Sequence, residues 1–249
     1  MANPILDIHN LKREFRMGSE TVRALKGVTF KVEPGEFVTI MGSSGSGKTT
    51  LLNILGCLDK PSEGDFLLDA INISMQSRNE LATIRNRKIG FVFQSYNLLA
   101  RTSALENVEL PLLYNSSISS KEREARAIRA LEAVKLGDRL HHLPNQLSGG
   151  QQQRVAIARA LVNEPVMILA DEATGNLDTR TSYEIMALLQ DFNQEQGKTI
   201  VFVTHEPDIA AFSSRTVLLK DGRVVKDTKN DNVRSAREML AALPMQDDY

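Results

Sequence analysis

A glycine-rich run of eight residues carries the strongest chemical signal in this sequence. Residues 42–49 match in full the pattern of a phosphate-binding loop, or P-loop. Its glycines let successive backbone N–H groups point into one concavity, and the helix expected to follow adds the positive end of its dipole. Such a loop favours a polyphosphate, with the Lys48 ammonium on the β- and γ-phosphates and the Thr49 hydroxyl on a bridging magnesium ion. The residues assigned to phosphate binding are Gly42, Ser43, Ser44, Gly45, Ser46, Gly47, Lys48, Thr49 and Thr50.

Two acids at the end of an apolar run supply the second signal. Asp171 and Glu172 directly follow residues 166–170, which are all apolar. Alone, two acids in this position are more often a solvated strand end, but the P-loop upstream favours a catalytic pair at the crevice of an α/β sheet. We therefore predict that Asp171 holds magnesium and that Glu172 polarises the water that attacks the γ-phosphate.

The third signal is a second anion-seeking turn, which we call the signature turn: Ser148, Gly149, Gly150 and Gln151. Ser148 is expected to cap a buried helix over residues 152–162, and a capped helix N-terminus attracts anions. No lysine or magnesium ligand stands next to this turn, so it looks like half of a site. Something else must bring the phosphate.

The elements that position these residues follow from the apolar pattern. Strands are predicted at residues 37–41, 89–93, 166–170 and 199–204, with helical patterns between them, which indicates an α/β fold with a parallel sheet. Short β-prone pieces at residues 5–8 and 28–32 predict a small antiparallel sheet beside this core. Residues 95–163 have almost no strand signal, and capping-box patterns at Ser103 and Ser119 predict an inserted helical subdomain.

The end of the chain predicts a hairpin around Asp221 and Gly222, between residues 217–220 and 223–225. A polar linker at residues 226–232 and a short helix at residues 235–243 are expected to follow. We thus expect one domain over residues 1–225. Residues 1–94 and 164–225 form its core and β subdomain, residues 95–163 form its helical subdomain, and residues 226–249 are a linker with a short helix.

Composition excludes several classes of protein. With 249 residues, 42% of them hydrophobic, the chain supports a sizeable core. Its net charge of −1 gives no global attraction to nucleic acid, so no nucleic-acid partner is expected. No apolar run approaches the roughly 20 residues of a spanning helix, and the first residues lack the features of a signal peptide. The single cysteine, Cys57, suits a reducing compartment and is expected to be buried. We expect a cytoplasmic protein.

The sequence Leu-Ser-Gly-Gly-Gln at residues 147–151 resembles the signature of the ABC ATPase family. The likeness extends over nearly the whole chain, to about residue 225. It implies a P-loop NTPase with a RecA-like core, an N-terminal antiparallel β subdomain and an inserted α-helical subdomain. It also implies an ATPase that uses ATP and Mg²⁺. In this family the signature turn closes over ATP held by the P-loop of a second subunit, so a homodimer formed on ATP binding is implied.

Four further positions match landmarks of that family. Gln94 resembles the Q-loop glutamine that contacts magnesium or water, although a lone glutamine would be read as a surface residue. Asp178 looks like the D-loop aspartate at the dimer seam, and His205 looks like the switch histidine that reaches the γ-phosphate. Phe15 stands where the family places an adenine-stacking aromatic, and an ordinary core phenylalanine would look the same.

The resemblance therefore implies three groups of site residues. The catalytic residues are Glu172, His205 and Lys48, and the magnesium ligands are Thr49, Gln94 and Asp171. ATP is bound by the P-loop, Gln94 and Phe15 of one chain and, in trans, by the signature turn and Asp178 of the other. One departure is visible: Ala173 replaces the family's usual proline after the glutamate, which is expected to change the stiffness of the loop more than its chemistry.

Within the family, residues 53–61, 151–156 and 169–172 resemble the MacB and LolD type. This implies a separate FtsX/MacB-like membrane permease, with or without a periplasmic or extracellular adaptor, and a chain that is peripheral on the inner face of the cell membrane. The work would be export or lipoprotein extraction, with permease contacts around residues 96–99 and 105–108, whose apolar residues could equally belong to the core. A nucleotide-gated regulatory subunit and a soluble ABC ATPase that acts on nucleic acid or ribosomes are the alternatives.

Overall fold

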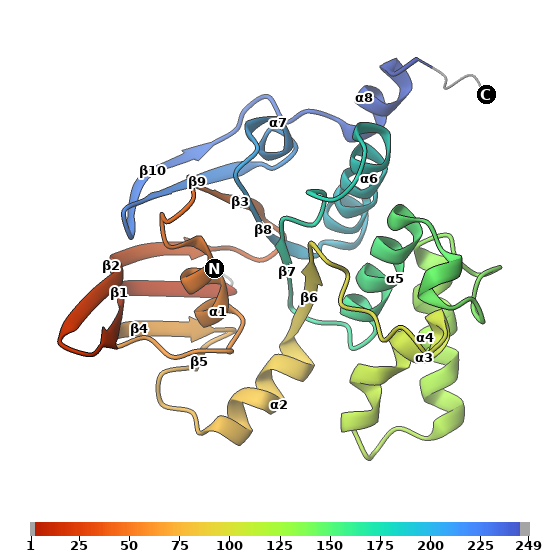
Figure 1. Ribbon diagram of the computed structural model, residues 1–249, viewed down its shortest axis with the longest axis horizontal. Helices are drawn as coiled ribbons and strands as arrows, with labels where there is room; N and C mark the ends of the chain where they lie inside the picture. The colour runs from red at the N-terminus through yellow and green to blue at the C-terminus, as the bar shows by residue number, and fades with distance from the viewer. Residues whose placement is uncertain (1–2, 245–249) are drawn as a thin grey trace.

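Six strands form the central sheet, in the order β10-β9-β3-β8-β7-β6. The computed structural model describes residues 3–244 (Figure 1). All neighbours in this sheet are parallel except β9 and β10, which form an antiparallel hairpin. The strands are β3 (Phe37–Met41), β6 (Ile89–Phe93), β7 (Met167–Asp171), β8 (Thr199–Thr204), β9 (Arg215–Lys220) and β10 (Arg223–Lys229). The predicted strands at residues 37–41, 89–93 and 199–204 are confirmed, and β7 is shifted by one residue because Asp171 still pairs with its neighbours.

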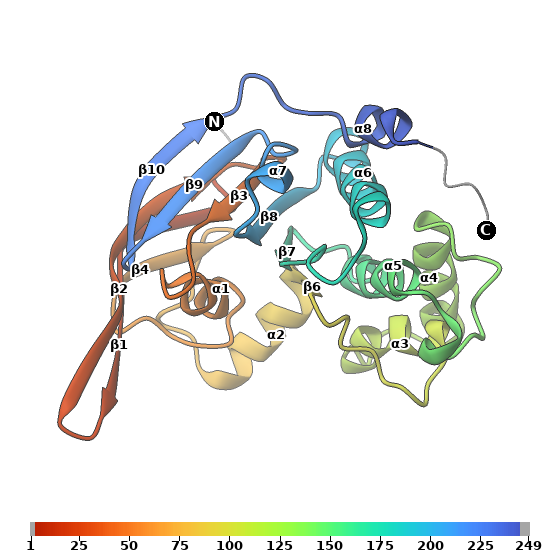
Figure 2. The same cartoon turned by 45° about the horizontal axis from the view of Figure 1, so that its top comes forward.

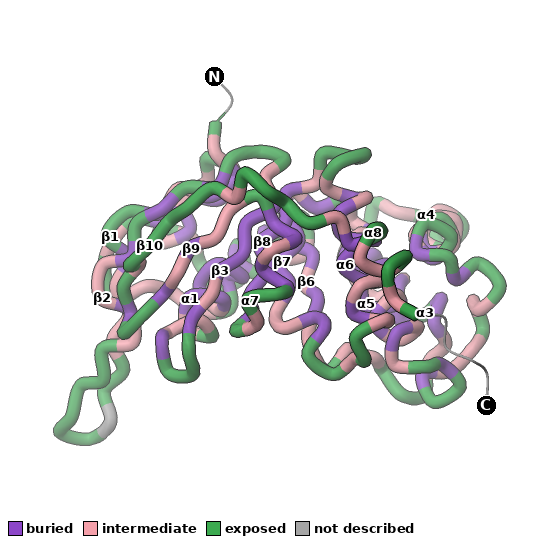
Figure 3. The backbone as a smooth tube through the Cα atoms, turned by 90° about the horizontal axis from the view of Figure 1, so that it is seen from above, coloured by how far each residue is buried: buried purple, intermediate pink, exposed green. Residues whose placement is uncertain are grey.

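The inner strands are buried on both faces, which explains their continuous apolar runs. In β8, Ile200 and Phe202 belong to one core and Val201 and Val203 to the other, as the alternation of a strand requires. The first core includes the helical part of the chain. The second lies around α1 (Lys48–Leu55), between the central sheet and the N-terminal sheet. Figure 3 shows buried backbone concentrated along these strands.

The N-terminal sheet is antiparallel, in the order β2-β1-β4-β5. Its strands are β1 (Leu6–Met17), β2 (Glu20–Val32), β4 (Glu63–Leu68) and β5 (Ile71–Asn72). The prediction of short β pieces was wrong in length, because β1 and β2 have 12 and 13 residues. Their outer ends are largely exposed, so they are held by the backbone ladder and carry no apolar pattern. Figure 2 shows this hairpin extending beyond the rest of the sheet.

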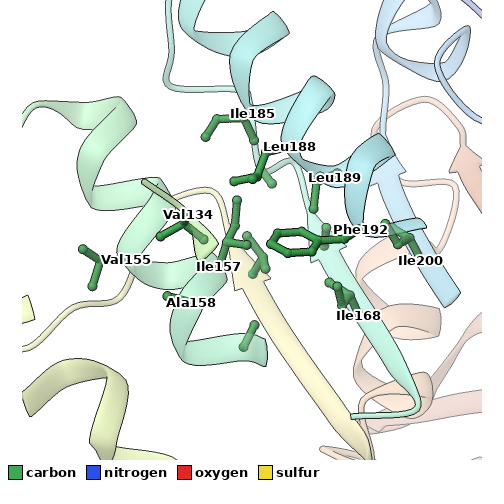
Figure 4. Close-up of a cluster of buried hydrophobic side chains, with 14 of the residues drawn as sticks. Val134, Val155, Ile157, Ala158, Ile168, Ile185, Leu188, Leu189, Phe192 and Ile200 are labelled. Atoms are coloured by element: carbon green, nitrogen blue, oxygen red, sulfur yellow. The ribbon is translucent and has the colours of Figure 1, made fainter. Parts of the chain in front are cut away.

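Residues 95–163 contain helices and no strand, as expected. These are α3 (Ala104–Glu109), a 3-10 helix at Leu110–Tyr114, α4 (Ser120–Ala133), a 3-10 helix at Pro144–Gln146, and α5 (Gly149–Leu161). Ser103 forms a complete capping box, and the Ser119 hydroxyl accepts a hydrogen bond from the Glu122 N–H at 3.2 Å. The side chains of Ile157, Leu189 and Phe192 join this helical part to α6 (Thr179–Gln196) and the sheet in one core (Figure 4).

The C-terminal segment differs from its prediction at one point. The expected linker from residue 226 is wrong for residues 226–229, which continue β10 against β9. Polar residues are tolerated there because β10 is an edge strand, and Asp227 is bound by Arg215 at 2.7 Å. The expected final helix is present as α8 (Ala236–Ala242), capped by Ser235 and packed on α6, while residues 245–249 of the predicted tail lie outside the described residues. Between residues 3 and 244, no helix is both long and apolar enough to cross a membrane.

Candidate functional site

A cavity of about 1080 Å³ lies at the carboxyl ends of β3, β7 and β8, and we call it the nucleotide cavity. The carboxyl edge of a parallel sheet is where ligands of α/β proteins bind. Most of the residues singled out for chemistry line it, although they come from four separate stretches of the sequence. They are Gly42, Ser43, Ser44, Gly45, Gly47, Lys48, Thr49, Thr50, Gln94, Asp171, Glu172 and His205.

The P-loop has the backbone that its glycines predict. Gly47 is the N-cap of α1 with φ 103°, a conformation that L side chains rarely adopt. At Gly42, an added Cβ would lie 2.4 Å from the Leu219 carbonyl oxygen, so no side chain fits. The Lys48 ammonium donates hydrogen bonds to the carbonyls of Gly42 and Ser43 at 2.7 and 3.0 Å, which holds the charge over the loop. Ser46, assigned to phosphate binding, is 2% exposed and lies beneath the cavity rather than lining it.

The environment of Asp171 suits a bound cation. Burial is the largest influence and raises the pKa of the Asp171 carboxyl. The neighbouring Glu172 charge raises this pKa further, and the Lys48 charge lowers it. The Asp171 carboxylate is therefore short of compensating positive charge. The Thr49 hydroxyl and the Gln94 side-chain amide line the same cavity, and together the three supply the oxygen ligands that Mg²⁺ prefers. The residues present fit a magnesium ion.

Glu172 is held in an uncommon backbone conformation. Its φ is 44°, in the left-handed region, which costs on the order of 1 kcal/mol for a residue with a side chain. Its N–H donates to the Val203 carbonyl at 2.9 Å, and its own carbonyl accepts from the Gly175 N–H at 2.9 Å. The His205 Nδ1 atom lies 2.8 Å from the Glu172 Oε1 atom. We call residues 172–175 the catalytic turn. Its backbone hydrogen bonds and the contact with His205 hold the Glu172 carboxylate at the wall of the cavity.

Sequence reasoning missed Asn176, which contacts Gln94 twice. The Gln94 Nε2 donates to the Asn176 Oδ1 at 3.3 Å, and the Asn176 Nδ2 donates to the Gln94 backbone carbonyl at 3.1 Å. The two positions are 82 residues apart, and no local pattern indicates that they meet. Asn176 thus orients the glutamine that was predicted as a magnesium ligand.

The signature turn has the predicted serine cap, but it does not line the cavity that contains the P-loop. The Ser148 Oγ accepts from the Gln151 N–H at 3.2 Å, and the Gln151 Oε1 accepts from the Ser148 N–H at 2.9 Å. At Gly150 an added Cβ would lie 2.4 Å from Thr181 Cγ2, so α5 begins in close contact with α6. No residue of the signature turn lines the nucleotide cavity of its own chain within the described part.

Asp178 also lies outside this cavity, and the structure gives it a local role. Its carboxylate caps α6, accepting from the Thr181 N–H at 2.9 Å and from the Thr181 hydroxyl at 2.6 Å. These hydrogen bonds lower the pKa of Asp178. A contribution of Asp178 to a second chain remains a prediction.

Phe15 is placed near the cavity without lining it. It pairs directly with Val22, which does line the cavity, and side chains of directly paired residues lie on the same face of a sheet. The ring is 38% exposed and stacks under the Arg13 guanidinium, 4.6 Å from the ring centroid. Its contact with adenine stays a prediction.

Ala173, which replaces a proline, is 2% exposed. Its N–H donates no hydrogen bond to any described residue, so a proline here would remove none. Its carbonyl accepts a hydrogen bond from the Gln153 Nε2 at 2.7 Å. The substitution therefore leaves the polar contacts of the catalytic turn available.

Comparison with known proteins identifies the family. Residues 25–175 match the family model described as ABC transporter, and this span contains the P-loop, the signature turn and the catalytic turn. The chain belongs to the ABC transporter family, as one of its ATP-binding proteins, and it is an ATPase whose hydrolysis is coupled to transport.

Its relatives include cassettes of the resembled branch. The ABC transporter ATP-binding protein YvrO of Bacillus subtilis is 52% identical over 91% of this chain and 98% of its own length. The macrolide export ATP-binding/permease protein MacB of Rhodopirellula baltica is 50% identical over 95% of this chain, which corresponds to 35% of that protein. A dimeric structure of the cassette MJ0796, bound to ADP and Pi, has a TM-score of 0.82 and 50% identity, covering 90% of this chain and 98% of that one.

Proposed function

We propose that two copies of this chain pair head to tail around two ATP molecules and drive a separate membrane permease. The observation that carries the proposal is the division of the site within one chain. The P-loop, Asp171 and Glu172 line one cavity, whereas the capped signature turn lies outside it. The N-terminus of α5 attracts anions, but within residues 3–244 no phosphate site of its own chain lies beside it. The ATP held in the cavity of a second copy supplies that phosphate. The MJ0796 cassette, at 50% identity, is dimeric in its ADP- and Pi-bound structure.

In this dimer each cavity binds ATP with the P-loop and holds magnesium with Thr49, Gln94 and Asp171. The magnesium ion, when bound, neutralises charge that develops on the phosphate oxygens. Glu172 accepts a proton from the attacking water, and His205 keeps the carboxylate in position while facing the γ-phosphate. Lys48 supplies a fixed positive charge to the same phosphates.

The permease contact is expected at a groove of about 650 Å³ between α2 (Arg78–Lys88), β6, the 3-10 helix at Leu110–Tyr114 and α5. Of the two alternatives for residues 105–108, the core is the correct one for Leu105 and Val108, which are at most 8% exposed and belong to the hydrophobic core. Tyr114, which lines the groove, is 84% exposed, and Leu99 of the predicted segment 96–99 is 49% exposed without lining it. Arg159 supports this rim by donating to the carbonyls of Tyr96 and Asn97.

The branch of the family suggests the kind of work. The name of the MacB relative describes one protein with an ATP-binding part and a permease part, and the present chain matches 35% of the length of that protein. We infer that the membrane part here is a separate FtsX/MacB-like permease, with or without an extracytoplasmic adaptor, and that the ATPase is peripheral on the inner face of the membrane. The transported cargo is exported or extracted from the membrane.

The decisive experiment measures magnesium-dependent ATP hydrolysis by the purified chain, alone and with its co-purified permease. Lys48→Ala should lower the rate on the order of 100-fold, because the charge on the phosphates is lost. Lys31→Ala is the matched control, since Lys31 only pairs with Asp7 at 3.0 Å on the surface of the N-terminal sheet. Hydrolysis that Lys48→Ala leaves unchanged would refute the proposed function.

A further inference from the structure

Gln153 connects α5, the helix that begins at the signature turn, to the catalytic turn. It lies on α5, five residues after the Ser148 cap, and is fully buried. Its Nε2 donates to the Ala173 carbonyl at 2.7 Å, across 20 residues of sequence. Ala173 directly follows Glu172, so this side chain joins the helix that starts at the signature turn to the turn that carries the predicted base.

The Gln153 amide satisfies one buried acceptor and leaves another unsatisfied. The Gln153 Oε1 is buried and accepts no hydrogen bond from any described residue. Methionine would fill a similar volume and remove this unsatisfied acceptor, but it would leave the Ala173 carbonyl without its donor. The donor toward Ala173 is the feature of this side chain that distinguishes glutamine from methionine here.

The surrounding contacts tie α5 to the catalytic turn. Gly150 packs against Thr181 so closely that an added Cβ would clash, which ties the start of α5 to the start of α6. On the other side, the Glu172 carbonyl closes the catalytic turn by accepting from the Gly175 N–H at 2.9 Å. Two side-chain hydrogen bonds among the described residues join these units: the Ser182 Oγ of α6 donates to the Thr174 carbonyl at 3.4 Å, and the shorter bond from Gln153 acts on the residue next to Glu172.

We propose that Gln153 is a positioning residue that couples the two ATP sites of the dimer. This rests on the proposed head-to-tail dimer, in which the signature turn of one chain contacts the ATP of the other. When that contact draws in the start of α5, Gln153 transmits the displacement to the Ala173 carbonyl and so to Glu172 of its own site. Glu172 of each chain is then correctly positioned only when the signature turn of the same chain contacts ATP at the opposite site.

Gln153→Met tests this coupling in the full-length protein. We expect kcat to fall about five- to tenfold, the scale of one lost hydrogen bond in the transition state, and the Hill coefficient for ATP to fall toward 1. The KM for ATP should stay within about twofold, because the P-loop is untouched. The melting temperature should change little, since the variant removes the unsatisfied Oε1 but leaves the Ala173 carbonyl without its donor.

Gln190→Met is the matched control. Gln190 is also a buried glutamine, but its Nε2 donates to the carbonyls of Phe212 and Arg234, and its Oε1 accepts from the Ala236 N–H. These hydrogen bonds hold the turn before β9 and the C-terminal segment against α6. This variant should lower the melting temperature while kcat per folded molecule stays within about twofold of wild type.

Three results would overturn the inference. The first is Gln153→Met with unchanged kcat and Hill coefficient, and the second is a parallel loss of melting temperature and activity that marks a merely structural role. The third is a wild-type protein whose hydrolysis does not depend on Lys48, which would overturn the proposed function itself. The wild-type and Lys48→Ala assays separate that failure from the first two.

Discussion

His205 Nδ1 and Glu172 Oε1 lie 2.8 Å apart, although the two residues are 33 positions apart in the sequence. Each side chain follows the carboxyl end of its strand, Glu172 after β7 and His205 after β8, and these strands are parallel neighbours. The histidine side chain is 59% exposed and the glutamate 25%. The pair therefore joins a partly enclosed carboxylate to an imidazole at the mouth of the cavity.

Glu172→Gln should separate ATP binding from hydrolysis. The amide is nearly isosteric but cannot accept the proton of the attacking water, so we expect hydrolysis to fall on the order of 100- to 10,000-fold. ATP-bound dimers should then accumulate, and light scattering in the presence of ATP measures them. Adding Lys48→Ala to this variant is the control and should abolish the dimers. A variant that stays monomeric with saturating ATP would count against the shared sites.

His205→Ala removes the contact with Glu172 and the group that faces the γ-phosphate. We expect kcat to fall on the order of 100-fold with little change in melting temperature, because the side chain is largely exposed. His9→Ala is a suitable control, since His9 also pairs with a carboxylate, Asp7 at 2.7 Å, on the N-terminal sheet. Steady-state kinetics checks both variants. Equal rates for the two would show that His205 has no catalytic role.

The raised pKa of Asp171 predicts a specific pH dependence. Burial and Glu172 favour the protonated form in the folded protein, so magnesium-dependent ATP binding should weaken on acidification at a pH above the ordinary aspartate pKa of about 4. Without nucleotide, the ionised carboxylate opposes folding at neutral pH. This penalty appears as pH rises through the raised folded pKa and is absent below the unfolded pKa.

Asp171→Asn should accordingly raise the melting temperature of the nucleotide-free protein at neutral pH while weakening magnesium binding. The stability gain should disappear below about pH 4, where the wild-type carboxyl is also neutral. Thermal unfolding from pH 3 to pH 8 measures this difference. A gain of the same size across that whole range would contradict the electrostatic cause.

Tyr114→Cys should crosslink to the permease if the groove beside α5 is the contact. Tyr114 lines this groove and is 84% exposed, and the native Cys57 will not interfere because burial raises the pKa of its thiol to about 12. Val225→Cys is the control: Val225 is 53% exposed on β10, at the opposite edge of the central sheet from β6. Adduct formation in membranes checks this. Equal crosslinking at both positions would refute a localised contact.

The sequence predicted the parts of the site that local patterns encode. The P-loop is a contiguous run whose glycines set its backbone, and Ser148 caps α5 through residues only three positions away. The strands that carry Asp171 and His205 were visible because both of their faces are buried. The full length of β1 and β10 was not visible, because backbone pairing extends into segments with polar side chains.

Residue types and local spacing thus indicated that this chain binds a nucleotide, and the resemblance of the signature turn implied a family whose sites are shared. Only the tertiary structure decided which distant residues touch, such as Asn176 with Gln94 and Gln153 with Ala173. It also placed Leu105 and Val108 in the core and the signature turn outside the nucleotide cavity. The physical reason is that a contact across 20 or 82 residues depends on how whole helices and strands pack, and neither partner's neighbours in the sequence carry that information.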